Sequence, residues 1–127
     1  MALCVTTGLS QARVWKTDII VQGDDAGAGA ATKKALEDEF GGLKNLRLTK
    51  TDEDLRVKID MLTIEGVTGR HGYATSVLVL QRLRCEGSPN RWILLISSVN
   101  ILAGPEDIAP FAKHVADKMK DIVAKAK

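Results

Sequence analysis

Residues 55–61 alternate without exception between apolar and charged side chains, and this segment constrains the fold more than any other part of the chain. Successive side chains of a β-strand point to opposite faces, so the pattern predicts a strand with one buried face and one solvent-exposed face. The apolar members are Leu55, Val57, Ile59 and Met61, and the charged members are Arg56, Lys58 and Asp60. A sheet that contains such a strand has a second layer packed against only one of its sides.

Four further segments have the composition of strands. They are rich in β-branched or apolar residues and are separated by polar or glycine-containing turns, and they span residues 14–21, 45–50, 73–83 and 91–101. We expect residues 66–72 and 86–90 to form hairpin loops, because short links that contain glycine favour antiparallel neighbours.

Two segments carry the signals of amphipathic helices. The first runs from about residue 28 to residue 40, follows Asp24 and Asp25, either of which can cap it, and stops at Gly41-Gly42. The second follows residues 104–107, where a proline and two acids suit the first turn of a helix, and its apolar residues recur at steps of three and four.

The order strand, helix, four strands, helix predicts an α+β fold in a single domain over residues 13–127. We expect a two-layer sandwich, with a mostly antiparallel five-stranded sheet and both helices on one of its faces. The other face of the sheet must then meet water or a partner.

Residues 2–12 carry no charge and end in Ser10-Gln11-Ala12, the arrangement of small residues that a signal peptidase accepts after an apolar stretch. We therefore expect residues 1–12 to be a signal-peptide remnant and the protein to be periplasmic or secreted. The alternative is a disordered N-terminus on a cytoplasmic protein, because no basic residue follows Met1. Cleavage after Ala12 would leave Cys85 as the single cysteine, so that no internal disulfide could form.

The strands at 73–83 and 91–101 are apolar on both sides near their centres, unlike residues 55–61. If the helices cover one face, the other face exposes an apolar patch of a kind that soluble monomers rarely leave open. We predict a protein-interaction surface that binds a partner protein or a second copy of the chain. Its residues are Leu78, Leu80, Trp92, Leu94 and Ile96. The alternative is that loops or the N-terminus cover this face.

No motif in the chain commits it to a chemistry, and we predict no cofactor and no metal site. Gly27-Ala28-Gly29 lies between a strand and a helix but lacks the third glycine of a dinucleotide loop, and Asp24 and Asp25 would repel a phosphate. Two histidines and one cysteine beyond residue 12 provide few of the ligands that zinc prefers.

Arg70, His71 and Tyr73 cluster around the first predicted hairpin and form the one candidate site for acid–base catalysis. A polar surface turn is the simpler explanation. Nucleic acid is a disfavoured partner, since the formal net charge is only +2 and aromatic residues make up 4% of the chain.

The segments Asp54–Asp60, Gly72–Val79 and Ile108–Asp117 resemble small uncharacterised exported proteins of Gram-negative bacteria. The order of elements also resembles that of the N-terminal domain of TolB and of related domains in outer-membrane assembly lipoproteins and penicillin-binding-protein activators. This resemblance implies a non-catalytic interaction module of the cell envelope, and no site residue transfers from these families.

Together these observations predict a non-catalytic, periplasmic or secreted domain that binds protein through an apolar sheet face. Two alternatives remain at this stage. One is a cytosolic binding module, with nucleic acid as one candidate ligand. The other is a small enzyme that uses Arg70, His71 and Tyr73.

Overall fold

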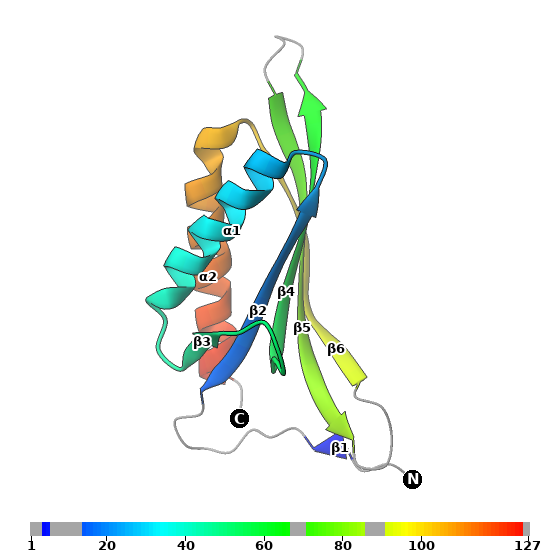
Figure 1. The fold of residues 1–127 in the computed structure, drawn as a ribbon, viewed down its shortest axis with the longest axis vertical. Coiled ribbons are helices and arrows are strands. Elements are labelled where there is room, and N and C mark those ends of the chain that lie inside the picture. Colours follow the sequence, from blue (N-terminus) through cyan, green and yellow to red (C-terminus); the bar gives the residue numbers. More distant parts are fainter. Residues whose placement is uncertain (1–3, 6–13, 67–70, 86–90, 126–127) are drawn as a thin grey trace.

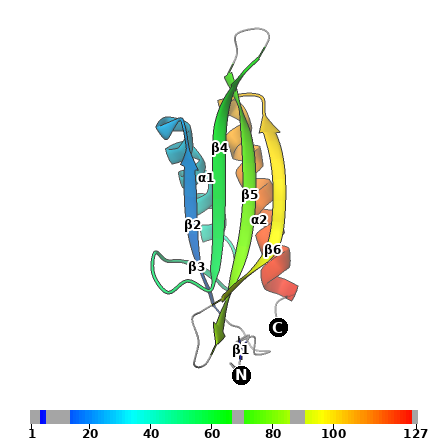
Figure 2. The same cartoon turned by 90° about the vertical axis from the view of Figure 1, so that its right-hand side faces the viewer.

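The computed structural model describes residues 4–5, 14–66, 71–85 and 91–125. A twisted sheet forms one layer and two helices pack on one of its faces, as Figure 1 shows from the edge of the sheet. Figure 2 views the opposite, helix-free face, with β2, β4, β5 and β6 side by side in front of the helices. The predicted α+β sandwich with helices on one face is therefore present.

Apart from β1, which was not predicted, the helices and strands lie close to their predicted positions. The strands are β1 (Cys4–Val5), β2 (Trp15–Gly23), β3 (Leu46–Leu48), β4 (Leu55–Glu65), β5 (His71–Cys85) and β6 (Arg91–Leu102). The helices are α1 (Ala26–Gly41) and α2 (Ile108–Lys125), and a 3-10 turn, η1 (Pro105–Asp107), precedes α2.

The sheet is mixed, so the prediction of a mostly antiparallel sheet is wrong in this detail. The neighbours run in the order β6, β5, β4, β2, β3, and β1 pairs with the last two residues of β5. β2 is parallel to both β3 and β4, whereas β4, β5 and β6 form an antiparallel meander.

β2 and β3 are parallel because α1 connects them, and β2 and β4 are parallel because residues 49–54 do not form a hairpin. They return from the end of β3 to the start of β2, where the Asp54 amide donates to the Lys16 carbonyl at 2.7 Å and the Lys16 amide donates to Asp54 Oδ2 at 3.1 Å. β4 then begins beside Thr17 and runs in the same direction as β2. Glu53 and Asp54, which sit in a polar turn of the sequence, are buried by this crossing.

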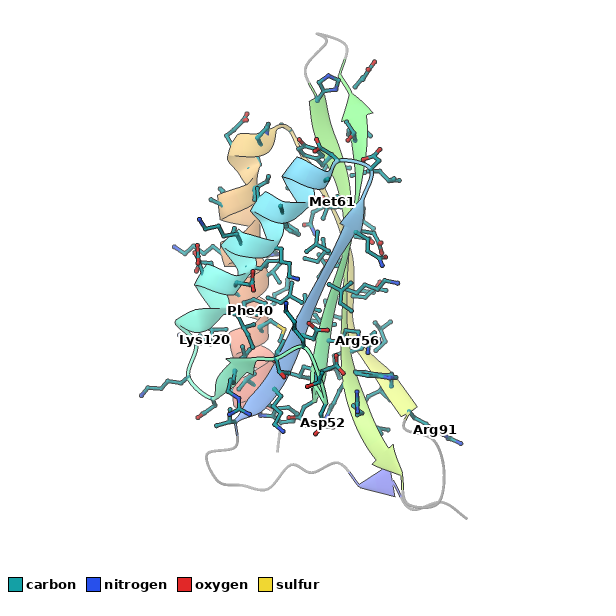
Figure 3. The ribbon with its side chains drawn as sticks, in the orientation of Figure 1. Phe40, Asp52, Arg56, Met61, Arg91 and Lys120 are labelled. Carbon is teal, nitrogen blue, oxygen red and sulfur yellow. The ribbon has the colours of Figure 1, made fainter. Side chains whose placement is uncertain are left out.

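The core lies between the sheet and the helices. The predicted alternation in β4 is confirmed, because its four apolar side chains are buried against the helix layer while Arg56 and Lys58 are not. Figure 3 shows Phe40 and Met61 between the helices and the sheet, and Arg56 on the other side. The buried face of α2 consists of Ile108, Phe111, Ala112, Val115, Ala116 and Met119.

The two aspartates before α1 have different roles. Asp25 is the N-cap, since its Oδ1 accepts a hydrogen bond from the Ala28 amide at 3.0 Å. Asp24 instead accepts from both the amide and the hydroxyl of Thr63, at 2.9 Å and 2.8 Å, and so connects the start of the helix to β4. These hydrogen bonds lower the pKa of the Asp24 carboxyl.

One glycine is required by close packing of backbone on backbone. A Cβ atom at Gly72 would lie 2.5 Å from the carbonyl oxygen of Leu102, closer than real Cβ contacts. Gly72 therefore allows the start of β5 to approach the end of β6.

Candidate functional site

The helix-free face of the sheet is divided into a charged half and an apolar half. On β2 and β4 the residues that alternate with the buried ones are mostly charged, and they include Lys16, Asp18, Arg56, Lys58 and Asp60. On β5 and β6 the corresponding positions are mostly aliphatic or small. The two halves adjoin along the β4–β5 pair, where Arg56 lies opposite Leu80 and Lys58 opposite Leu78.

The aliphatic side chains of this face form what we call the apolar patch. It consists of Leu62 from β4, Leu78 and Leu80 from β5, and Leu94, Val99 and Ile101 from β6. Leu94 is 56% exposed, Val99 74% and Ile101 65%, and Leu62 is similarly open. Their neighbours across the ladder are Leu80 for Leu94, Ser76 for Val99 and Ala74 for Ile101, so the patch follows the β5–β6 pair for most of its length.

Ile96 does not belong to this face, and its predicted place there is wrong. A register shift in the β5–β6 pair sets Val79 opposite Ile96 but Leu80 opposite Leu94, so that β6 contains one extra residue, Leu95. Ile96 consequently turns toward the helices and packs against the core. The same bulge brings Val99 and Ile101 to the helix-free face, which strict alternation had placed on the other side.

A cluster of ion pairs occupies the end of the face near the crossing of residues 49–54. The Arg82 guanidinium donates to Glu53 Oε1 at 2.6 Å and lies 3.6 Å from Asp52 Oδ1. Arg56 approaches the second oxygen of Glu53 at 3.6 Å. The Glu53 side chain is only 6% exposed, so it is the buried centre of this cluster.

Trp92 joins the ion-pair cluster to the apolar patch. It lies opposite Arg82 in the ladder, and the guanidinium carbons of Arg56 and Arg82 lie 4.2 Å and 5.0 Å from the centre of its ring. Such cation–π contacts hold the ring in place. Trp92 is half-buried, so of the predicted interaction residues Leu94 is the most open to a partner.

The carboxyl of Asp18 is affected by this arrangement. Burial raises its pKa above the usual value, and the hydrogen bond and negative charge of Glu53 raise it further. Lys33 and Arg56 act in the opposite direction but more weakly. The charged half of the face therefore contains two acids in contact, with arginines beside them.

The residues of the predicted catalytic site are not brought together in the described part of the chain. Arg70 lies outside the described residues. His71 is exposed at the start of β5, opposite Glu65, whereas Tyr73 is buried and its hydroxyl donates to Asp25 Oδ2 at 3.4 Å. Burial, followed by the charge of Asp25, raises the pKa of Tyr73, which makes the phenol a weaker acid.

The other predicted sites can be placed in the same way. Among the described residues, no group of three or more His, Cys, Asp or Glu side chains is arranged to hold a metal ion. Beside Trp92, the crossing of residues 49–54 balances the charge of Arg82, because Asp52 and Glu53 pair with this arginine. No signal in the sequence indicated these pairs, since the partners are 29 or more residues apart.

No protein-family model and no curated protein sequence matches the chain. Two solved structures are similar to it over most of their length. The hypothetical protein CT253 from Chlamydia trachomatis is 12% identical with a TM-score of 0.45, covering 88% of this chain and 95% of its own. A PelC variant from Paraburkholderia phytofirmans, described as a dodecamer, is 8% identical with a TM-score of 0.49, covering 100% of this chain and 99% of its own. At these scores and identities the two similarities establish neither a function nor an assembly.

Proposed function

We propose that this chain is a non-catalytic protein-interaction domain that binds through the apolar patch. The observation that carries the proposal is the exposure of Leu94, Val99 and Ile101, each more than half open on a face without helices. Contiguous aliphatic surface of this kind is characteristic of protein contacts. The charged half of the same face shows that this sequence can make a solvated surface where one is needed.

A second copy of the chain is the first partner to test. In the described part of the chain β6 pairs only with β5, so its other edge is open. Between Arg91 and Leu102 only Arg91 is charged, and there is no proline. Natural sheets usually protect such edges with lysine, proline or short strands. At the opposite edge of the sheet the outermost strand, β3, is protected in this way, because it has three residues and Lys44 and Lys50 flank it.

Pairing of two β6 edges would join the two apolar patches into one continuous surface. Leu94, Val99 and Ile101 lie on the strand at the contact, so each would gain cross-strand neighbours from the second copy that shield part of its exposed surface. Arg91 lies at one end of the strand, and no other charge of β6 would oppose a charge of the second copy. Pairing of this kind thus brings no like charges together along the strand.

Export from the cytoplasm is part of this proposal, and it rests on the uncharged residues 2–12. Cleavage after Ala12 would remove β1, which contributes two paired residues, and would leave the core intact. None of the described helices is long and apolar enough to cross a membrane. Sequencing the N-terminus of the mature protein tests the expected cleavage.

Light scattering coupled to size-exclusion chromatography tests the binding mode. We expect the wild-type protein to self-associate and Val99→Lys to be monomeric under the same conditions. Val14→Lys is the matched control, because Val14 is also an exposed valine (51%) but precedes β2, away from β6 in the sheet. A wild-type protein that stays monomeric at the highest attainable concentration would refute association through β6.

A further inference from the structure

The pairing of β6 with β5 shows to which face of the sheet each β6 side chain points. Figure 2 shows β6 at one edge of the sheet, beside β5. The β6 residues on the helix-free face are Trp92, Leu94, Ser97, Val99 and Ile101. Those on the helix side are Ile93, Ile96, Ser98, Asn100 and Leu102. Leu95 is the extra residue of the bulge and has no partner in β5.

This order of faces limits how β6 can pair with a second β6. In a two-fold antiparallel pair of identical strands, one residue lies on the axis opposite its own copy, and residues at equal steps from the axis lie opposite each other. Opposed side chains point to the same face of the sheet. The order of faces must therefore read the same in both directions from the axis, with the bulged Leu95 left out of the count.

An axis at Ser97 satisfies this condition over the whole strand. With Leu95 left out, β6 has five residues on each side of Ser97, and every residue from Arg91 to Leu102 receives a partner. An axis at Ile96 would leave residues 101–102 without a partner, and an axis at Ser98 would leave residues 91–92 without one. The register centred on Ser97 thus pairs the most residues.

The same register brings apolar side chains together on the helix-free face. Leu94 lies opposite Val99 of the second copy, and Trp92 lies opposite Ile101 of the second copy. Cross-strand pairs of an aromatic with a β-branched residue stabilise a sheet. The Trp92 ring is already positioned by two arginines, so it loses little freedom when it is covered. The three most exposed aliphatic residues of β6 all receive an apolar partner.

We propose that two copies of the chain pair through β6 about a two-fold axis at Ser97. The product is one continuous sheet with the helices of both copies on the same face. This inference rests on the proposed self-association and adds its register. The contact uses the β6 edge of both copies, so the assembly is closed at two chains. The outermost strand at each end is then the short β3.

Cysteine cross-linking of the full chain, in a Cys4→Ser/Cys85→Ser background, tests this register. Ser97→Cys places a thiol on the axis, where opposed Cα atoms lie about 4.5–5.5 Å apart, within the range of a disulfide. Leu94→Cys and Val99→Cys are the matched controls, because both residues are more than half exposed on the same face of β6. Each lies about 13 Å along the strand from its own copy, beyond disulfide reach. Combined in one chain, the two control cysteines lie opposite each other across the contact.

After oxidation with diamide, we expect non-reducing electrophoresis to show a covalent dimer for Ser97→Cys and for Leu94→Cys/Val99→Cys. Each single control should remain mostly monomeric on the gel. Light scattering of the background protein measures self-association independently of any disulfide. Self-association without a Ser97→Cys disulfide, or with a Val99→Cys disulfide in the single variant, would overturn the register and leave the proposed function standing. A monomer by light scattering would overturn both.

Discussion

The strongest stability prediction concerns Glu53, the buried centre of the ion-pair cluster. Replacing it with alanine removes the carboxylate that Arg82 contacts at 2.6 Å and Arg56 at 3.6 Å. Two guanidinium groups then remain close together, and the Nε atoms of both are already buried without a hydrogen-bond partner. Removing one partner of a fully buried ion pair typically destabilises a protein by about 3–5 kcal/mol.

Three features of the site reduce this figure. The Arg56 side chain is 32% exposed, so water can solvate part of its charge. Arg82 keeps Asp52 at 3.6 Å. Asp18 also loses an unfavourable neighbour, because Glu53 contributes to the raised pKa of its carboxyl. We therefore expect Glu53→Ala to lower the free energy of unfolding by about 2–3 kcal/mol.

Urea unfolding followed by tryptophan fluorescence measures this loss. With a slope of about 1.5–2 kcal/mol per molar urea, the midpoint should fall by roughly 1–2 M. Asp52→Ala is the matched control, because Asp52 belongs to the same cluster but is 56% exposed in its pairs with Lys16 and Arg82, which predicts a change below about 1 kcal/mol. Equal midpoints for the two variants would refute the argument that the Glu53 ion pairs contribute more to stability because they are buried.

Two other substitutions test individual parts of the structure. The raised pKa of Asp18 means that the folded state binds the proton of this carboxyl more tightly than the unfolded state does. The contribution of Asp18 to stability therefore falls as pH rises through the folded-state pKa. Asp18→Asn should thus be more stable than wild type at pH 7, and equally stable well below the ordinary pKa of 3.8. Urea midpoints across this range check the sign, and a variant less stable than wild type at pH 7 would contradict it. Gly72→Ala should lower the free energy of unfolding by about 1–3 kcal/mol, because the added methyl group meets the Leu102 carbonyl oxygen at 2.5 Å. Gly41→Ala is the control and should cause no loss, because a Cβ atom there meets no atom within 4 Å. Thermal unfolding distinguishes the two variants, and equal melting temperatures would count against the close approach at Gly72.

Periodicity alone was sufficient to predict the elements and the buried face of most of them. The alternation in residues 55–61 identified which β4 side chains face the helices, and the steps of three and four in residues 108–122 identified the buried stripe of α2. These patterns are local, because each face of a strand or helix is read from neighbours in the sequence.

The pairing of strands was not predictable in the same way. Residues 49–54 are long enough either to turn back as a hairpin or to cross over β2, and the choice depends on contacts with distant residues. Glu53 is buried only because Arg82 and Arg56 meet it, and nothing near Glu53 in the sequence indicates such partners. The bulge at Leu95 likewise has no glycine or proline to mark it, so Ile96 was placed on the wrong face.

The crossing of residues 49–54 also explains why the helix-free face has two different halves. By bringing Asp52 and Glu53 over the start of β2, it supplies the acids that neutralise Arg56 and Arg82, and the cluster closes that end of the face within the chain itself. The β5–β6 half receives no such segment from the described residues, so its aliphatic side chains stay open. The same crossing ends β3 after three residues and thereby leaves Ile19 and Val21 unpaired at the other edge. One short connection thus determines both where the chain completes its own surface and where it leaves an edge of the sheet open.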